Sequence, residues 1–314
     1  MKKTIITLLI ILVTSAFSYA QSGKGMHDYT PLPFPDEEYT DDMRISRGGQ
    51  LYDDWWRTKV DVDKPEEDHP LWKTQSANKR NGYSTYRCKE CHGWDYKGKD
   101  GAYRNGSHYT GFKGVYAASN KMSVSELEAL LRGSTNKDHD FSQYLNDGDI
   151  YDLAIFIKRG VIDMAEFVNS YGSAVGGSES RGGRFFMNNC MMECHGRTGQ
   201  MINFADEKDP EFVSTIAKKN PWEFIHKMRA GQPGTRMRSG IILKWSDDDI
   251  RDVLSYARIL SEEVPKPGWL SVFIGSVFGI ELGIGDKSES KEKKKQHHEW
   301  VIVDEGRGFG PIIE

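Results

Sequence analysis

The feature that most constrains this chain is Cys88-Lys89-Glu90-Cys91-His92, a C-x-x-C-H pentapeptide. If the segment is helical, both thiols lie on one side of a turn, where they can bond the two vinyl groups of a haem. His92 follows directly, so its imidazole can reach the iron. A C-x-x-C pair can also form a disulfide, half of a zinc site or a redox pair, but neither a cluster of further zinc ligands nor a βαβ pattern is visible. The pentapeptide therefore predicts covalent haem attachment.

A second set, Cys190-Met191-Met192-Glu193-Cys194-His195, has one extra residue between its thiols. Sulfurs four residues apart suit thioether attachment only if the helical turn loosens, as in a π-type bulge. The two sets use all four cysteines of the chain, which leaves none for a separate disulfide, a zinc site or a thiolate ligand. The alternative for the second set is a haem-free relic. Because both sets continue as Cys-His-Gly, we expect two covalently attached haem c groups.

The N-terminal residues 1–20 have the pattern of a signal peptide. Lys2 and Lys3 precede an apolar run at 5–13, and Ser18-Tyr19-Ala20 offers a small-residue cleavage site. The alternative, a membrane anchor, needs a longer apolar run. We therefore expect a periplasmic protein with no membrane-spanning segment after signal removal, which suits haem attachment outside the cytoplasm. Removal of the two lysines changes the formal charge from −4 to −6, so electrostatics do not favour a nucleic-acid partner.

An internal repeat predicts two similar helical units. Gly48-Gly49-Gln50-Leu51-Tyr52 matches Gly182-Gly183-Arg184-Phe185-Phe186, and each segment leads into one cysteine set. Middle helices are expected at 123–133, with a Ser123–Glu126 capping box, and at 221–231, with proline first; each ends at glycine. Terminal helices follow, with matching apolar stripes one hundred residues apart: Ile150, Leu153, Ala154 and Ile157, then Ile250, Val253, Leu254 and Ala257.

This order of elements resembles the class I cytochrome c domain, present twice in tandem. The resemblance covers about residues 47–160 and 180–261, and residues 88–114 are similar to the first domain of periplasmic dihaem cytochromes associated with oxidation of small inorganic compounds. It implies an all-α fold of two tandem class I cytochrome c domains packed around covalent haems. In domains this short, covalent haem supplies apolar contact that the side chains alone cannot.

The composition divides the chain into six segments. We expect a signal peptide at 1–20, an extended N-terminal arm at 21–46, domain 1 at 47–160, a linker at 161–179, domain 2 at 180–262 and a C-terminal extension at 263–314. The polar stretch 58–82 is expected to be a loop insertion that covers part of the first haem. The linker is flexible in composition, yet we expect it to pack between the domains, because two haems that exchange electrons must stay close.

The resemblance also implies a sixth iron ligand in the loop between the middle and terminal helices. In the second copy this loop offers Met237, in a segment similar to the family's Gly-x-Met-Pro loop with Arg238 in place of proline. Met228 and Met201 are the alternatives. A thioether ligand raises the potential of the second haem.

For the first haem we assign the sixth ligand to His139 by the register of the repeat. Arg132 in the first copy corresponds to Arg229 in the second. His139 lies seven residues after Arg132, and Met237 lies eight residues after Arg229. Met122 and His108 are alternatives, and a histidine between two aspartates can also be a surface residue. With His92 and His139 as ligands, the first haem is expected to have the lower potential.

The predicted function is electron transfer between periplasmic redox partners, by the chain alone or as a subunit of a larger complex. The alternative is a dihaem oxidoreductase of the peroxidase or sulfur-compound dehydrogenase type, or the electron-transfer subunit of such an enzyme. Against an enzyme, no cysteine is spare for the thiolate ligand that thiosulfate dehydrogenases use. No base can be singled out either, so we assign no catalytic residue.

Overall fold

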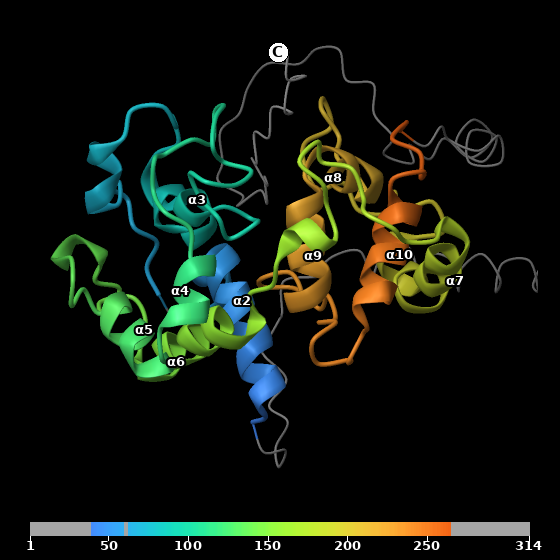
Figure 1. Ribbon diagram of the computed structural model, residues 1–314. Helices are drawn as coiled ribbons and strands as arrows, with labels where there is room; N and C mark the ends of the chain where they lie inside the picture. The colour runs from blue at the N-terminus through green and yellow to red at the C-terminus, as the bar shows by residue number, and fades with distance from the viewer. Residues whose placement is uncertain (1–38, 60–61, 265–314) are drawn as a thin grey trace, which may run out of the picture.

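The computed structural model describes residues 39–59 and 62–264 (Figure 1). The predicted signal peptide, most of the N-terminal arm and nearly all of the C-terminal extension lie outside the described residues. Within these residues the fold is helical, and β-type pairing is confined to isolated bridges such as that between Gly98 and Lys113. The predicted all-α class is therefore confirmed. Among the helices described, none has both the length and the apolar character needed to cross a membrane.

The first half is built around α2 (Asp41–Thr58), which packs against α6 (Asp147–Ile155) and its π-helical continuation η5 (Phe156–Gly160). Short elements surround this pair: η2 (Pro70–Thr74), η3 (Gly82–Tyr86), α3 (Cys88–His92), α4 (Tyr116–Lys121), α5 (Val124–Leu131) and η4 (Lys137–His139). The capping box of Ser123 and Glu126 at the start of α5 is confirmed. The helix α4, by contrast, is not among the predicted elements.

The helix α2 begins earlier than the sequence suggests. Residues 41–46 are expected to belong to an extended arm, but they form the first turns of α2, so that part of the prediction is wrong. Thr40 caps the helix by accepting a hydrogen bond from the Met43 N–H, and Asp41 and Asp42 suit the positive end of the helix dipole. Ser46 is buried and donates a hydrogen bond to the Ala230 carbonyl, so tertiary contacts also hold this turn.

The second half pairs α7 (Glu179–Asn189) with α10 (Asp247–Ala257). Between them lie η7 (Met191–His195), α8 (Val213–Lys219) and α9 (Pro221–Ala230). As predicted, α9 starts with proline and is followed by Gly231, whose positive φ of 88° suits glycine. In Figure 1 the two halves lie side by side, with α9 next to α2.

The linker is packed against the body of the protein, as expected. It contains the short helix η6 (Met164–Glu166), and the side chains of Met164, Phe167 and Val168 are buried in the hydrophobic core. Arg251 of α10 also reaches the linker, where its Nε donates a hydrogen bond to the Glu166 carbonyl. The flexible composition of this segment therefore does not prevent it from joining the two halves.

The two helix pairs repeat one packing device. A Cβ added at Gly48 would lie 2.0 Å from the carbonyl oxygen of Asp152, and one added at Gly182 would lie 1.9 Å from that of Asp252. A Cβ added at the following glycine would also meet an aromatic ring in each copy, that of Phe156 at 3.1 Å from Gly49 and that of Tyr256 at 3.0 Å from Gly183. The matched glycines therefore let the entry helix and the terminal helix approach closely in both halves.

Candidate functional site

The C-x-x-C-H segment forms the helix α3, as predicted. The helix is one short turn that ends at Gly93, which has φ of 77° and donates its N–H to the Lys89 carbonyl at 2.9 Å. Cys88 and Cys91 therefore lie on one turn, and both line one pocket together with His92. All four cysteines of the chain are free thiols. Burial raises the pKa of Cys88 to about 12 and that of Cys91 further, so both thiols are neutral.

The ring of His92 is oriented by a backbone carbonyl. Its Nδ1 lies 2.6 Å from the carbonyl oxygen of Lys113. Since a carbonyl only accepts, Nδ1 carries the proton and the lone pair is on Nε2. Burial, together with the nearby His139, lowers the pKa of His92 to about 4, so the ring is neutral. This is the tautomer that a metal-binding imidazole needs.

His139 stands opposite His92. The two ring centres are 6.2 Å apart, and the ring planes meet at 78°. The Nδ1 of His139 faces the Leu130 carbonyl at 3.3 Å, which again leaves Nε2 for another partner. Two imidazoles bound to one metal ion through nitrogen–metal bonds of about 2.0–2.1 Å have ring centres roughly 6 Å apart. The separation of the two rings therefore matches that of two imidazoles bound to one metal ion.

The alternatives for the first site have other surroundings. His108 stacks on Tyr103 with ring centres 4.8 Å apart, and its Nδ1 lies 4.0 Å from a Glu90 carboxylate oxygen. Met122 follows the last turn of α4 and packs, partly buried, against the hydrophobic core. Of the three candidates, His139 is the one whose ring contacts His92.

Apolar and aromatic side chains complete the pocket of the first site. Tyr86, Phe112 and Phe141 contribute to its lining. The predicted insertion contributes His69 and Leu71, so this segment does cover the pocket. The sequence prediction did not include His69, because it lies in the insertion and no residue of the second copy corresponds to it.

The second cysteine set forms the π-helical turn that its spacing predicts. In η7 the His195 N–H donates to the Cys190 carbonyl at 3.1 Å, and the Gly196 N–H donates to the Met191 carbonyl at 3.0 Å. Both bonds span five residues, so the extra residue is absorbed by a wider turn. Cys190 is buried and Cys194 is exposed. Burial raises the pKa of Cys190 to about 12.

The histidine of the second set is less well supported than His92. Its ring lies between Phe204 and Phe186, with centre distances of 6.0 and 6.4 Å. Burial lowers the pKa of His195, and its buried Nδ1 has no hydrogen-bond partner among the described residues. Among the described residues, the second site therefore has no counterpart of the carbonyl that orients His92 in the first.

Met237 occupies the predicted loop between α9 and α10. Its side chain is partly buried against the hydrophobic core, and its backbone carbonyl lies beside Gly231. Of the alternatives, Met228 is buried within α9 and Met201 is 65% exposed. The exposed position disfavours Met201 as a ligand. The pairing of Met237 with His195 stays a prediction.

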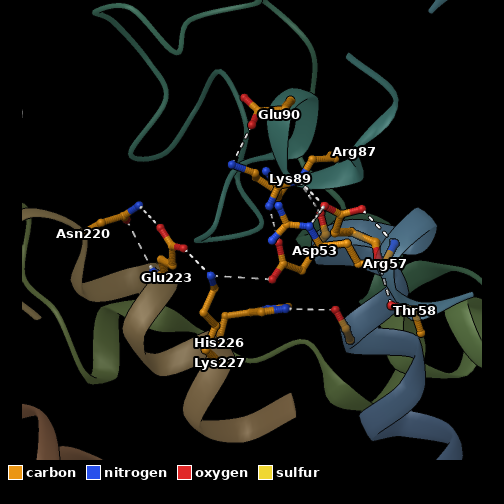
Figure 2. Close-up of polar contacts among 12 residues, drawn as sticks. Asp53, Arg57, Thr58, Arg87, Lys89, Glu90, Asn220, Glu223, His226 and Lys227 are labelled. Atoms are coloured by element: carbon orange, nitrogen blue, oxygen red, sulfur yellow. Dashed lines mark hydrogen bonds and ion pairs between the residues drawn. The ribbon is translucent and has the colours of Figure 1, made fainter. Parts of the chain in front are cut away.

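A group of charges with two buried carboxylates joins the two halves (Figure 2). Lys227 of α9 lies 2.6 Å from Glu223 and reaches Asp53 of α2 at 3.9 Å. Asp53 also accepts hydrogen bonds from Arg87, which directly precedes the first cysteine. Burial by itself raises the pKa of Asp53, but Lys227 and Arg87 outweigh it and lower the pKa to about 2. The carboxylate is therefore charged and compensated at the boundary between the halves.

Next to this charge group, His226 forms a neutral bridge. It is completely buried, its Nδ1 accepts from the Tyr96 hydroxyl at 2.8 Å, and its Nε2 donates to the Gly49 carbonyl at 3.0 Å. Its ring also contacts Trp94 at a centre distance of 5.0 Å. Burial lowers the pKa of His226 to about 4. A residue of the second half is thus held by three residues of the first, one in α2 and two in the loop after α3.

Comparison with known proteins finds no match among protein families, curated sequences or solved structures. Within residues 39–59 and 62–264, no three His, Cys, Asp or Glu side chains gather as a metal-binding cluster. The pocket around His92 and His139 brings these two histidines and two cysteines together.

Proposed function

We propose that this chain is a periplasmic dihaem c-type cytochrome, exported by its signal peptide, that transfers electrons between redox partners. The observation that carries the proposal is the pair His92 and His139, which face each other across a pocket lined by Cys88 and Cys91. Both rings have Nδ1 next to a backbone carbonyl, so each keeps its Nε2 lone pair for another partner. A covalently bound haem would supply reversible one-electron oxidation of its iron.

The residues of the first site would divide the work of holding that group. Cys88 and Cys91 would bind the vinyl carbons, and His92 and His139 the iron. The Lys113 carbonyl keeps the His92 ring in one orientation and tautomer. Tyr86, Phe112 and Phe141 would cover the group and limit access of water.

The second site would use the π-helical turn. Cys190 and Cys194 would attach the second haem, with His195 and Met237 as iron ligands. Because a thioether favours ferrous iron more than an imidazole does, the two haems would have unequal potentials. The contacts of Lys227 and His226 with the first half keep the two halves in one arrangement, which supports electron exchange within the chain.

Haem content and intact mass test the proposal. The mature protein, exported in a host that attaches haem, should contain two haems per chain by pyridine haemochrome analysis, and its mass should include both. Replacing Cys88 and Cys91 together by alanine should remove one haem, and replacing Cys190 and Cys194 should remove the other. A colourless protein with the mass of the polypeptide alone would refute the proposal.

The second candidate function is a dihaem oxidoreductase, or an electron-transfer subunit of one. The observation that supports it is His69, an additional histidine in the pocket of the first site. Such an enzyme needs an iron that binds external ligands. Visible spectra recorded with and without cyanide or carbon monoxide distinguish the two functions. Rapid, stoichiometric binding by the purified protein would favour the enzyme over the carrier.

A further inference from the structure

His69 is a third histidine at the first candidate site, and it comes from the insertion that the second half lacks. It is only 6% exposed and lines the same pocket as Cys88, Cys91, His92 and His139. Its ring centre lies 6.4 Å from that of His139, at an interplanar angle of 62°. A buried imidazole therefore lies beside the expected sixth ligand.

The hydrogen bonds of His69 determine its tautomer and hold it in place. Its Nδ1 accepts the N–H of Leu71 at 3.2 Å, so the ring proton is on Nε2. Its backbone N–H donates to the Thr85 hydroxyl at 2.8 Å. No hydrogen bond found among the described residues uses Nε2. The site therefore contains an oriented N–H donor whose hydrogen-bonding capacity is not satisfied by the neighbouring residues.

The two histidines that face each other are held unequally. His92 has a hydrogen bond of 2.6 Å to a carbonyl, whereas His139 has one of 3.3 Å and belongs to a three-residue helix whose other two residues are exposed. His139 is thus the ligand that can be displaced at the smaller structural cost. If His139 moved away, His69, whose ring centre lies 6.4 Å from that of His139, would be the histidine next to the place it left.

We propose that His69 is a distal hydrogen-bond donor of the first site, which stabilises a small anion bound at the sixth iron position when His139 is displaced. This inference rests on the proposed haem and extends it to a ligand-binding site. The ligand class is a small anion with a lone pair on its outer atom, because a hydrogen bond from an N–H group is stronger when the acceptor is charged.

Azide binding to the purified ferric dihaem protein tests the role of His69. The variant His139→Ala opens the sixth position, and azide affinity is measured from the visible spectrum with and without His69→Asn. Asparagine preserves the helix-capping acceptor for the Leu71 N–H, but its shorter side chain removes the donor at the Nε2 position. Loss of a hydrogen bond to a charged ligand should weaken azide binding about 10–100-fold.

Two further variants separate a distal role from a structural one. His69→Gln in the same background carries an amide donor with longer reach and should recover part of the affinity. His69→Asn alone should leave the low-spin spectrum unchanged, because His139 remains bound. Equal azide affinities for His139→Ala with and without His69→Asn would refute the role of His69. Absence of haem at Cys88 and Cys91 would instead refute the proposed function, and this inference with it.

Discussion

At the scale of single residues, backbone carbonyls decide how the candidate ligands point. The Lys113 carbonyl lies 21 residues beyond His92 in sequence, and the Leu130 carbonyl lies nine residues before His139. Each takes up Nδ1 and leaves Nε2 directed elsewhere. Side-chain type identifies a potential ligand, but a hydrogen bond to the main chain makes it available.

Replacing His139 by methionine should raise the potential of the first haem and leave that of the second unchanged. A thioether is a weaker donor than imidazole and favours ferrous iron, so the shift is upward. A spectroelectrochemical titration of the wild-type and variant proteins measures both potentials. If both potentials and the low-spin spectrum stay the same, His139 is not the ligand.

The buried His226 should make stability depend on pH. Its pKa falls from the ordinary 6.5 to about 4 in the folded protein because it is buried. Between these values the unfolded chain binds a proton that the folded chain does not, so stability decreases as pH falls from about 6.5 to 4. The slope from this one group is at most about 1.4 kcal/mol per pH unit.

Urea unfolding at several pH values checks this contribution. His226→Gln should be less stable than the wild type at pH 7, since the bonds to Tyr96 and Gly49 are altered. Its stability should nevertheless change less steeply over the same pH range. Parallel curves for the two proteins would show that His226 does not contribute to the acid sensitivity.

At the scale of elements, the same helix pair occurs in both halves with the same contacts. Arg47 of α2 pairs with Asp152 at 2.9 Å, and Arg181 of α7 pairs with Asp252 at 2.6 Å. Close approach at Gly48 and Gly182 completes the match. The repeat thus includes the side chains that join each entry helix to its terminal helix, as well as the apolar stripes.

Replacing Gly48 or Gly182 by alanine should destabilise the protein by about 1–3 kcal/mol or more, as overpacking of a tight contact does. The added Cβ would meet a backbone carbonyl oxygen at 2.0 or 1.9 Å, which cannot move without shifting the partner helix. Chemical denaturation measures the loss. The control is Gly148→Ala in α6, where the nearest atom is 3.4 Å away.

The control should be neutral or stabilising by up to about 1 kcal/mol, since alanine favours a helix more than glycine does. Equal effects at Gly148 and Gly48 would mean that helix propensity, and not the crossing of the two helices, determines the result.

At the scale of the whole molecule, α9 joins the halves through two kinds of contact. Ser46 and Gln50 donate hydrogen bonds to the Ala230 carbonyl, while Lys227 faces Asp53. Lys89, between the two cysteines of the first set, is completely buried and pairs with Glu90 at 2.6 Å (Figure 2). The charged residues next to the first site therefore lie close to those at the interface between the halves.

Replacing Lys227 by methionine should destabilise the contact between the halves by about 3 kcal/mol, because Asp53 and Glu223 stay buried with less compensation. Hydrogen exchange of the α9 amides and denaturant unfolding measure the effect. Lys218→Met is the matched control, since its pair with Glu262 is exposed and contributes about 0–1 kcal/mol. Unchanged exchange in α9 of Lys227→Met would mean that Lys227 does not hold the interface.

Local patterns in the sequence were sufficient for several features. Short-range chemistry determines the capping box at Ser123, the proline start of α9, the π-helical turn at Cys190 and the buried stripes of α6 and α10. Each depends on residues a few positions apart, whose contacts a periodic pattern reveals. The repeat also indicates where extra residues enter, and the segment marked in this way contributes His69 and Leu71 to the pocket.

Only the tertiary structure decided the features that join distant residues. No local pattern predicts the contacts between residues that are far apart in the sequence. These are the Lys113 carbonyl with His92, His69 with His139, Ser46 with the Ala230 carbonyl, and Lys227 with Asp53. They arise because chain segments that are far apart in the sequence pack against each other. Every residue has a main-chain carbonyl, so the residue type does not indicate which carbonyl will accept a hydrogen bond. The sequence therefore predicts which residues can bind a group, but the packing of the chain determines which atoms orient those residues.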